Sequence, residues 1–209
     1  MTLPDGVSRR TFDGEDALAT RGEPVYGEST ADGWRRWNPN RSKLGAMIEL
    51  GLETGLEADS TVLYLGAANG TTVSHVTDVA GPTYAVEFAP RPARDLLDVA
   101  SSRPTLIPLL KDARQPETYA HVVEADVDLL VQDVATRGQA TVANRNRRFL
   151  ADDGRLVAAI KARSEDVTEP PETVFDRVLE GLSDRYSIET TESLEPYHAA
   201  HLAVVASPD

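Results

Sequence analysis

The sequence predicts an α/β protein built on an open, mostly parallel sheet, and three observations support this fold class. Apolar runs of strand length alternate with segments of helical periodicity from about residue 59 onward. Glycine turns or acidic residues directly follow several runs, as in sheets that bind ligands beyond the carboxyl ends of their strands. The apolar runs number seven. We therefore expect a seven-stranded sheet with interleaved helices.

The first 58 residues have a different character. They contain glycines, prolines and short alternating runs such as Val7–Phe12, followed by a helix-like segment from Leu44 to Leu52. We predict a small β-rich N-terminal part, residues 1–58, that leads into the main domain, residues 59–209.

The first β-α-β unit of the main domain carries a glycine turn. A strand over 61–65 leads into Gly66-Ala-Ala-Asn-Gly70-Thr-Thr72, a helix over 73–80 follows, and a second strand over 83–87 ends at Glu87. A turn of this kind presents backbone amides to an anionic or nucleotide-like ligand. An alternative is a hairpin turn at Asn69-Gly70, but the following segment has the pattern of a helix.

The spacing of this unit favours an adenosine-containing ligand. Glu87 lies about 20 positions after Gly66, the separation that brings a second-strand acid to the ribose hydroxyls of a bound nucleotide. The loop lacks the third glycine of the dinucleotide fingerprint, which disfavours NAD.

The remaining elements follow from the same patterns. Pro108 places the third strand at a sheet edge, because proline donates no ladder hydrogen bond. Asp153-Gly154 predicts a turn into the fifth strand, and the last two strands are expected to be antiparallel. The predicted strands are 106–110, 127–133, 156–160, 186–191 and 202–206, and the predicted helices are 92–102, 139–149 and 171–183.

Composition bounds the setting of the protein. The chain has 34 acidic and 21 basic side chains, a net charge of −13, only three lysines and no cysteine. Spread acids and scarce lysine are typical of proteins from high-salt cells, where a Debye length of about 3 Å weakens long-range repulsion of phosphates. The negative charge therefore does not exclude an RNA partner. Because no signal or apolar run of membrane length is present, we expect a soluble, cytoplasmic protein with no membrane partner.

Polar groups follow four of the predicted strands and should converge on one crevice. These are the loop from Gly66 to Thr72, then Glu87, Asp112 and Asp133. Each acid alone would equally suit a helix cap or a solvated loop. Lys161 follows the fifth strand and either reaches solvent or lies half-buried beside Asp133 with a lowered pKa.

The segment from Trp34 to Lys43 is the densest basic and aromatic cluster, and it holds both tryptophans. Indole faces and guanidinium groups bind unpaired bases and phosphates, so Arg35, Arg36 and Arg41 are predicted RNA contacts. The alternative is packing of the N-terminal part on the core, which we expect for at least one tryptophan. A second cluster over 145–148 is explained by the dipole of a helix C-terminus.

The four histidines do not have metal-ligand spacing, so no metal site is predicted. His201 begins the last strand and either faces the crevice from the side of Lys43 or serves a structural role. The sequence contains no G-x-S-x-G motif, which lowers the case for a hydrolase.

Several segments, in order along almost the whole chain, resemble the fibrillarin family, and specifically its archaeal members. Two positions depart from the family pattern: Thr136 stands where the family usually has glutamine, and Asn69 stands where it usually has serine. Gln139 still matches the family, and the arginine- and glycine-rich arm of eukaryotic members is absent. The composition points to a halophilic archaeon. The matching segments are Trp37–Leu44, Val62–Val76, Tyr84–Phe88, Lys111–Arg114, Asp133–Ala135, Ile160–Ala162 and Leu194–Tyr197 with His201.

The resemblance implies a Rossmann-like class I methyltransferase that uses S-adenosyl-L-methionine to methylate ribose 2′-hydroxyls of rRNA and tRNA. It also implies a box C/D guide RNA, a Nop-domain scaffold protein and a kink-turn-binding protein as partners. By position, the implied catalytic residues are Lys43, Asp133, Lys161 and His201, with Lys161 as base or hydroxyl orienter. The implied cofactor-binding residues are Gly66, Ala67, Gly70, Thr71, Thr72, Glu87, Phe88, Asp112, Ala113, Asp133, Val134, Ala135 and Thr136.

Two alternatives remain from the sequence. An NAD-linked oxidoreductase shares the sheet class but needs nicotinamide binding, which the missing third glycine disfavours. A non-catalytic subunit of an RNA particle would keep the fold without turnover, and the complete set of Lys43, Asp133, Lys161 and His201 argues against that loss.

Overall fold

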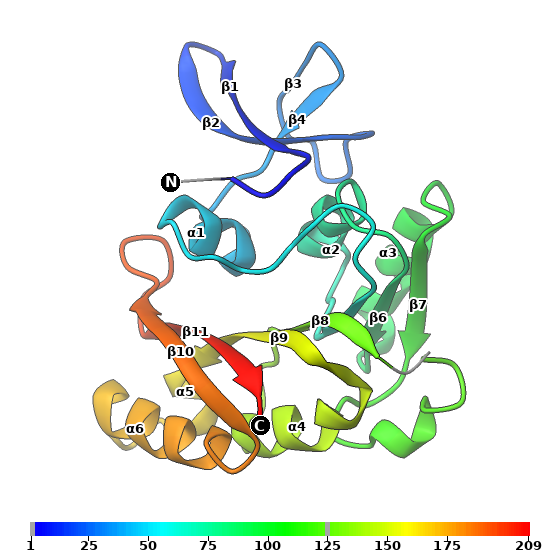
Figure 1. Ribbon diagram of the computed structural model, residues 1–209. Helices are drawn as coiled ribbons and strands as arrows, with labels where there is room; N and C mark the ends of the chain where they lie inside the picture. Colours follow the sequence, from blue (N-terminus) through cyan, green and yellow to red (C-terminus); the bar gives the residue numbers. More distant parts are fainter. Residues whose placement is uncertain (1–2, 124–125) are drawn as a thin grey trace.

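A seven-stranded sheet forms the centre of the computed structural model, which describes residues 3–123 and 126–209 (Figure 1). Its order is β10-β11-β9-β8-β5-β6-β7; the five strands from β9 to β7 are parallel, and β11 and β10 are antiparallel. The predicted fold class is therefore confirmed. The strands are β5 (Val62–Leu65), β6 (Thr83–Glu87), β7 (Leu106–Leu110), β8 (Val127–Gln132), β9 (Leu150–Lys161), β10 (Tyr186–Ser193) and β11 (His201–Pro208).

Helices cover both faces of this sheet because side chains alternate along each strand. On β5, Val62 and Tyr64 join one core cluster, and Leu63 and Leu65 join the other. The first cluster includes α1, α2 and α3, and the second includes α4 and α6, on the opposite side of the sheet in Figure 1. The helices are α1 (Lys43–Glu49), α2 (Thr71–Thr77), α3 (Pro90–Ala100), α4 (Gln139–Asn146), α5 (Ala162–Glu165) and α6 (Pro171–Leu182), with short 3₁₀ segments at Pro116–Thr118 and Arg147–Phe149.

Strand β7 lies at the edge of the sheet, as Pro108 predicted, and the two final strands are antiparallel as expected. The predicted turn at Asp153-Gly154 is wrong, because β9 runs without interruption from Leu150 to Lys161. The register against β8 shifts here instead. A Cβ on Gly154 would lie 2.7 Å from Leu150 Cδ1, so the glycine permits a bulge within the strand rather than a turn that ends it.

The N-terminal part forms a separate antiparallel sheet of order β1-β2-β4-β3, which lies over α1 and α2 in Figure 1. Leu18 and Trp37 from this part share a core cluster with Val62 of the main sheet. The boundary near residue 58 stays a prediction, since residues on both sides pack together. The strands are β1 (Val7–Phe12), β2 (Glu15–Arg21), β3 (Thr30–Ala31) and β4 (Trp34–Arg36).

Within the described residues, each helix is too short or too polar to cross a membrane.

Candidate functional site

Polar residues from separate strands meet at the carboxyl edge of the parallel strands. Glu87 ends β6, Asp112 follows β7, Asp133 follows β8 and Lys161 ends β9. A cavity of about 240 Å³ lies at this edge. The predicted cofactor residues that line it are Gly66, Glu87, Phe88, Asp112, Ala113, Asp133, Val134, Ala135 and Thr136.

Two glycines shape the loop after β5. Gly66 has a φ of 86°, and a Cβ there would lie 2.3 Å from the carbonyl oxygen of Asp133, so the two loops approach backbone to backbone. Gly70, with a φ of 90°, is the N-cap of α2, which is why this helix begins at Thr71 rather than at the predicted Val73. The remaining predicted loop residues lie outside the lining of the cavity: Ala67, Gly70, Thr71 and Thr72.

The carboxylate of Glu87 faces this cavity and is anchored on both oxygens. The amide of Ala68 donates to Oε2 at 2.9 Å, and the amide of Ala89 donates to Oε1 at 2.7 Å. A carboxylate has about four acceptor positions, so these two bonds leave capacity for ligand hydroxyls. Phe88 beside it is 64% exposed. An anchored acid next to a free aromatic face suits a ligand with paired hydroxyls and a flat ring.

Asp112 is fixed at the rim of the cavity by Arg114. Nε and Nη2 of Arg114 donate to the Asp112 carboxylate at 3.0 and 2.7 Å, and this hydrogen bonding lowers the pKa of Asp112. The Arg114 guanidinium also lies 5.9 Å from the ring centre of Phe88. The charge of Asp112 is thus largely directed at Arg114.

Lys43 and Asp133 form an ion pair at the same edge, with Nζ 3.0 Å from Oδ2. Lys43 is the first residue of α1, where Ser42 caps the helix by accepting from the Gly45 amide at 3.0 Å. A lysine at a helix N-terminus faces the positive end of the dipole, and Asp133 offsets this cost. Asp133, the carboxylate named in one of the two alternatives for Lys161, thus forms an ion pair with Lys43.

Lys161 and His201 lie directly opposite each other on the paired strands β9 and β11. Nδ1 of His201 donates to the carbonyl of Ala199 at 2.8 Å, because a carbonyl oxygen only accepts. Burial lowers the pKa of His201, and the positive charge of Lys43 adds to this effect. In the neutral ring Nε2 then carries a lone pair, and this buried atom has no hydrogen-bond partner within the described residues.

The basic and aromatic cluster is mostly structural. Arg35 is fully buried, with Glu28 at 2.5 Å and Asp78 at 2.6 Å, so its predicted RNA contact is wrong. Both tryptophans are also buried, which removes them as platforms for bases and confirms that Trp37 packs on the core. Trp37 stacks on His75 of α2 at 4.9 Å between ring centres.

Two arginines of this cluster keep solvent access. The Arg36 side chain is 30% exposed and pairs with Glu15 at 3.0 Å. Arg41 is exposed and lies over the ring of Tyr26 at 4.8 Å. An RNA-binding role of Arg36 and Arg41 stays a prediction.

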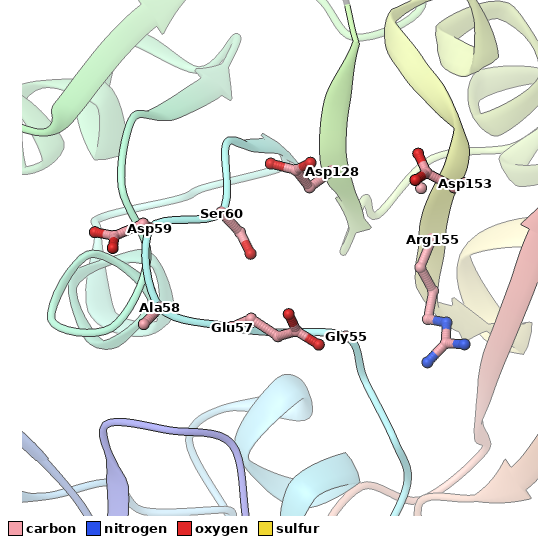
Figure 2. A pocket seen from close by; sticks show the side chains of 9 residues that line it. Gly55, Glu57, Ala58, Asp59, Ser60, Asp128, Asp153 and Arg155 are labelled. Atoms are coloured by element: carbon pink, nitrogen blue, oxygen red, sulfur yellow. The ribbon is translucent and has the colours of Figure 1, made fainter.

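A second hollow, of about 440 Å³, lies at the opposite ends of the strands (Figure 2). It is lined by acidic side chains including Asp59, Asp128 and Asp153, with Arg155 beside them. Asp128 accepts from the Thr61 amide at 2.7 Å, which is a structural role. Among the residues that the structure describes, no group of three or more His, Asp or Glu could hold a metal ion.

Sequence reasoning missed three polar residues that support the site: Gln132, Glu165 and His198. Nε2 of His198 donates to the carbonyl of Pro39 at 2.8 Å, which joins the loop before Lys43 to the loop before His201. These residues are 159 positions apart, so no local pattern indicates the contact. In the sequence, Gln139 is distinguished only by its match to the family pattern.

Comparisons with known proteins identify the family of the chain. The family model described as fibrillarin matches residues 9–209. A fibrillarin-like rRNA/tRNA 2′-O-methyltransferase of Halobacterium salinarum is 69% identical over 100% of both chains.

Solved structures give the same assignment. Aeropyrum pernix fibrillarin, in complex with natively bound S-adenosyl-L-methionine, is 42% identical with a TM-score of 0.88, over 99% of this chain and 96% of that chain. A chain of a fibrillarin/Nop5p complex is 40% identical with a TM-score of 0.91, over 100% of both chains. The family match covers well over half of the sequence, and the structural similarity extends over nearly the whole fold. The chain belongs to the fibrillarin family.

Proposed function

We propose that this chain is an S-adenosyl-L-methionine-dependent RNA ribose 2′-O-methyltransferase that modifies rRNA and tRNA. The observation that carries the proposal is the meeting of an adenosine-type cavity with Lys43, Asp133, Lys161 and His201 at one sheet edge. The names of the relatives support the same activity.

The residues present fit the cofactor. Glu87 would accept hydrogen bonds from the ribose hydroxyls, and Phe88 would cover one face of the adenine. When bound, S-adenosylmethionine supplies a methyl group from its sulfonium sulfur, and the rest of the cofactor leaves as a neutral thioether. The other contacts follow the family positions: Asp112 and Ala113 at the adenine edge, Asp133 to Thr136 beside the sulfonium, and Thr71 and Thr72 by the methionine end.

The catalytic groups would prepare the ribose hydroxyl, which is a poor nucleophile. Nε2 of His201 is a buried acceptor without a partner in the described part of the chain, so it can accept the hydroxyl hydrogen. The ammonium of Lys161, directly across the strand pair, can donate to the hydroxyl oxygen and orient it. The Lys43–Asp133 ion pair would hold in place the sheet edge at which the ribose hydroxyl receives the methyl group.

The proposed setting is a cytoplasmic box C/D particle. The solved fibrillarin/Nop5p complex supports a Nop-domain scaffold protein as one partner. A guide RNA and a kink-turn-binding protein complete the particle, and Arg36 and Arg41 are the proposed RNA contacts on this chain.

A reconstituted particle tests this function with two matched target RNAs, one of which has 2′-deoxyribose at the target nucleotide. We expect one methyl group on the ribose target by mass spectrometry and none on the deoxy target. Methylation of the deoxy target would mean base methylation instead. A folded particle that binds S-adenosylmethionine but transfers nothing would favour the non-catalytic alternative.

A further inference from the structure

Gln139 makes a two-point contact with the main chain of Lys161. The Lys161 amide donates to Oε1 at 2.9 Å, and Nε2 donates to the Lys161 carbonyl at 3.0 Å. Strand β8 pairs with β9 only as far as Ala158, so the last residues of β9 extend beyond β8 on this side. There the Gln139 side chain makes the hydrogen bonds that a neighbouring strand would make, while His201 pairs with Lys161 on the other side.

Glu165 fixes Gln139 from the element that follows Lys161. Its carboxylate accepts from the amides of Gly138 and Gln139 at 2.9 and 3.0 Å, and from Nε2 of Gln139 at 3.1 Å. The N-cap of α4 is Gly138, which has no side chain to cap the helix, so Glu165 supplies the cap and complements the dipole.

The same network holds the loop that lines the cavity. Nε2 of Gln132, at the end of β8, donates to the carbonyl of Gln139 at 2.9 Å. Gln132 and Gln139 are both fully buried. The loop 133–136 lies between them, so its two ends are tied to each other, and the Gln139 end is tied to the peptide of Lys161.

We propose that Gln139 and Glu165 are positioning residues that place Lys161 and the cavity loop 133–136 relative to each other. This inference rests on the proposed function, because it gives these two residues, called the clamp from here on, a role in methyl transfer. A buried side-chain amide whose oxygen and nitrogen are both hydrogen-bonded is a rigid link. An apolar residue in its place would leave the Lys161 amide and carbonyl unpaired. Loss of the clamp should therefore move the lysine and loosen the loop together.

Selective ¹³C labelling of lysine tests the clamp, because the chain has only three lysines. The variant is Gln139→Met, and the matched control is the exposed Gln115→Met. We expect the Lys161 Cε–Hε resonance to shift in Gln139→Met, the Lys111 resonance to stay in place, and methyl transfer to fall by about tenfold or more. The affinity for S-adenosylmethionine, measured by calorimetry, should weaken in the same variant.

An unchanged Lys161 resonance with transfer within about twofold of wild type would overturn the proposal. If Gln139→Met does not fold, Glu165→Gln serves instead: it keeps the shape of the side chain but removes the negative charge and one acceptor. The same shift is expected there, and its absence overturns the proposal. If wild-type protein transfers no methyl, the proposed function fails, while the resonance and the calorimetry still decide the clamp.

Discussion

Nζ of Lys43 lies 3.0 Å from Oδ2 of Asp133, across 90 positions of sequence. The lysine begins α1 beside the N-terminal sheet, and the aspartate follows β8 of the main sheet. This ion pair joins the N-terminal part to the edge where the cavity and His201 lie. Both side chains are about one-fifth exposed, so the pair is accessible to solvent.

Removal of the lysine from this pair should affect transfer more than cofactor binding. In Lys43→Met, the unpaired Asp133 loses its fixed position, and we expect methyl transfer to fall by about 100-fold. The dissociation constant for S-adenosylmethionine should stay within about threefold, because Lys43 is not part of the cavity lining. A large loss of affinity with normal turnover would assign Lys43 to the cofactor instead.

Lys161→Ala should abolish transfer and leave cofactor affinity nearly intact. The reason is that Lys161 lies opposite His201 and is not part of the cavity lining. Single-turnover assays of the particle together with calorimetry make the comparison. Near-normal turnover in this variant would remove Lys161 from the mechanism.

Phe88→Ala should weaken S-adenosylmethionine binding without changing stability. The ring is 64% exposed, so the fold gains little from it, whereas stacking on a base contributes about 1–3 kcal/mol. We expect at least about a tenfold rise in the dissociation constant, with an unchanged melting temperature. Leu97→Ala, a similarly exposed apolar residue on α3, is the control and should change neither value. Equal affinities of wild type and Phe88→Ala would show that adenine does not stack there.

Arg35→Met should destabilise the fold by about 3–5 kcal/mol, because it removes the cation that pairs with the buried carboxylates of Glu28 and Asp78, and Arg103, 3.7 Å from Asp78, replaces it only in part. Arg41→Met removes an exposed arginine from the same cluster and should change stability by less than about 0.5 kcal/mol. Denaturant unfolding in molar potassium chloride measures both. Comparable stability of the two variants would contradict the buried network.

Stability should fall as the pH drops below about 6.5, partly through His75. Burial, with the charges of Arg35 and Arg103, lowers the pKa of His75 in the folded protein. Between that value and about 6.5 the unfolded chain binds more protons, so acidification favours unfolding. His198 and His201, whose pKa values burial also lowers, contribute with the same sign.

His75→Gln should therefore reduce the slope of unfolding free energy against pH between about pH 7 and pH 5. The same substitution at an exposed position, His121→Gln, is the matched variant with which this slope is compared. An unchanged slope in His75→Gln would mean that this histidine does not titrate differently in the two states.

The sheet was predictable from the sequence because apolar runs, glycine turns and Pro108 report local geometry. The bulge near Gly154 was wrongly predicted as a turn, because a glycine that permits a bulge has the same local sequence as one that forms a turn. Gly66, Glu87, Asp112 and Asp133 were predictable from their places at strand ends. The other predicted residues of the cavity lining came from the family resemblance: Phe88, Ala113, Val134, Ala135 and Thr136. The ion-pair partners of Arg35 and Lys43 were not predictable, because a basic residue bound to distant acids has the same local sequence as one that binds RNA.

Calorimetric titration in molar potassium chloride, with S-adenosylmethionine as the ligand and NADH as the comparison, shows directly whether the cavity binds a methyl donor. We expect saturable one-to-one binding of the methyl donor and no binding of NADH, because Glu87 and Phe88 suit one adenosine and the loop lacks the third glycine of a dinucleotide site. Binding of NADH alone, or no binding by the folded protein, would contradict this expectation.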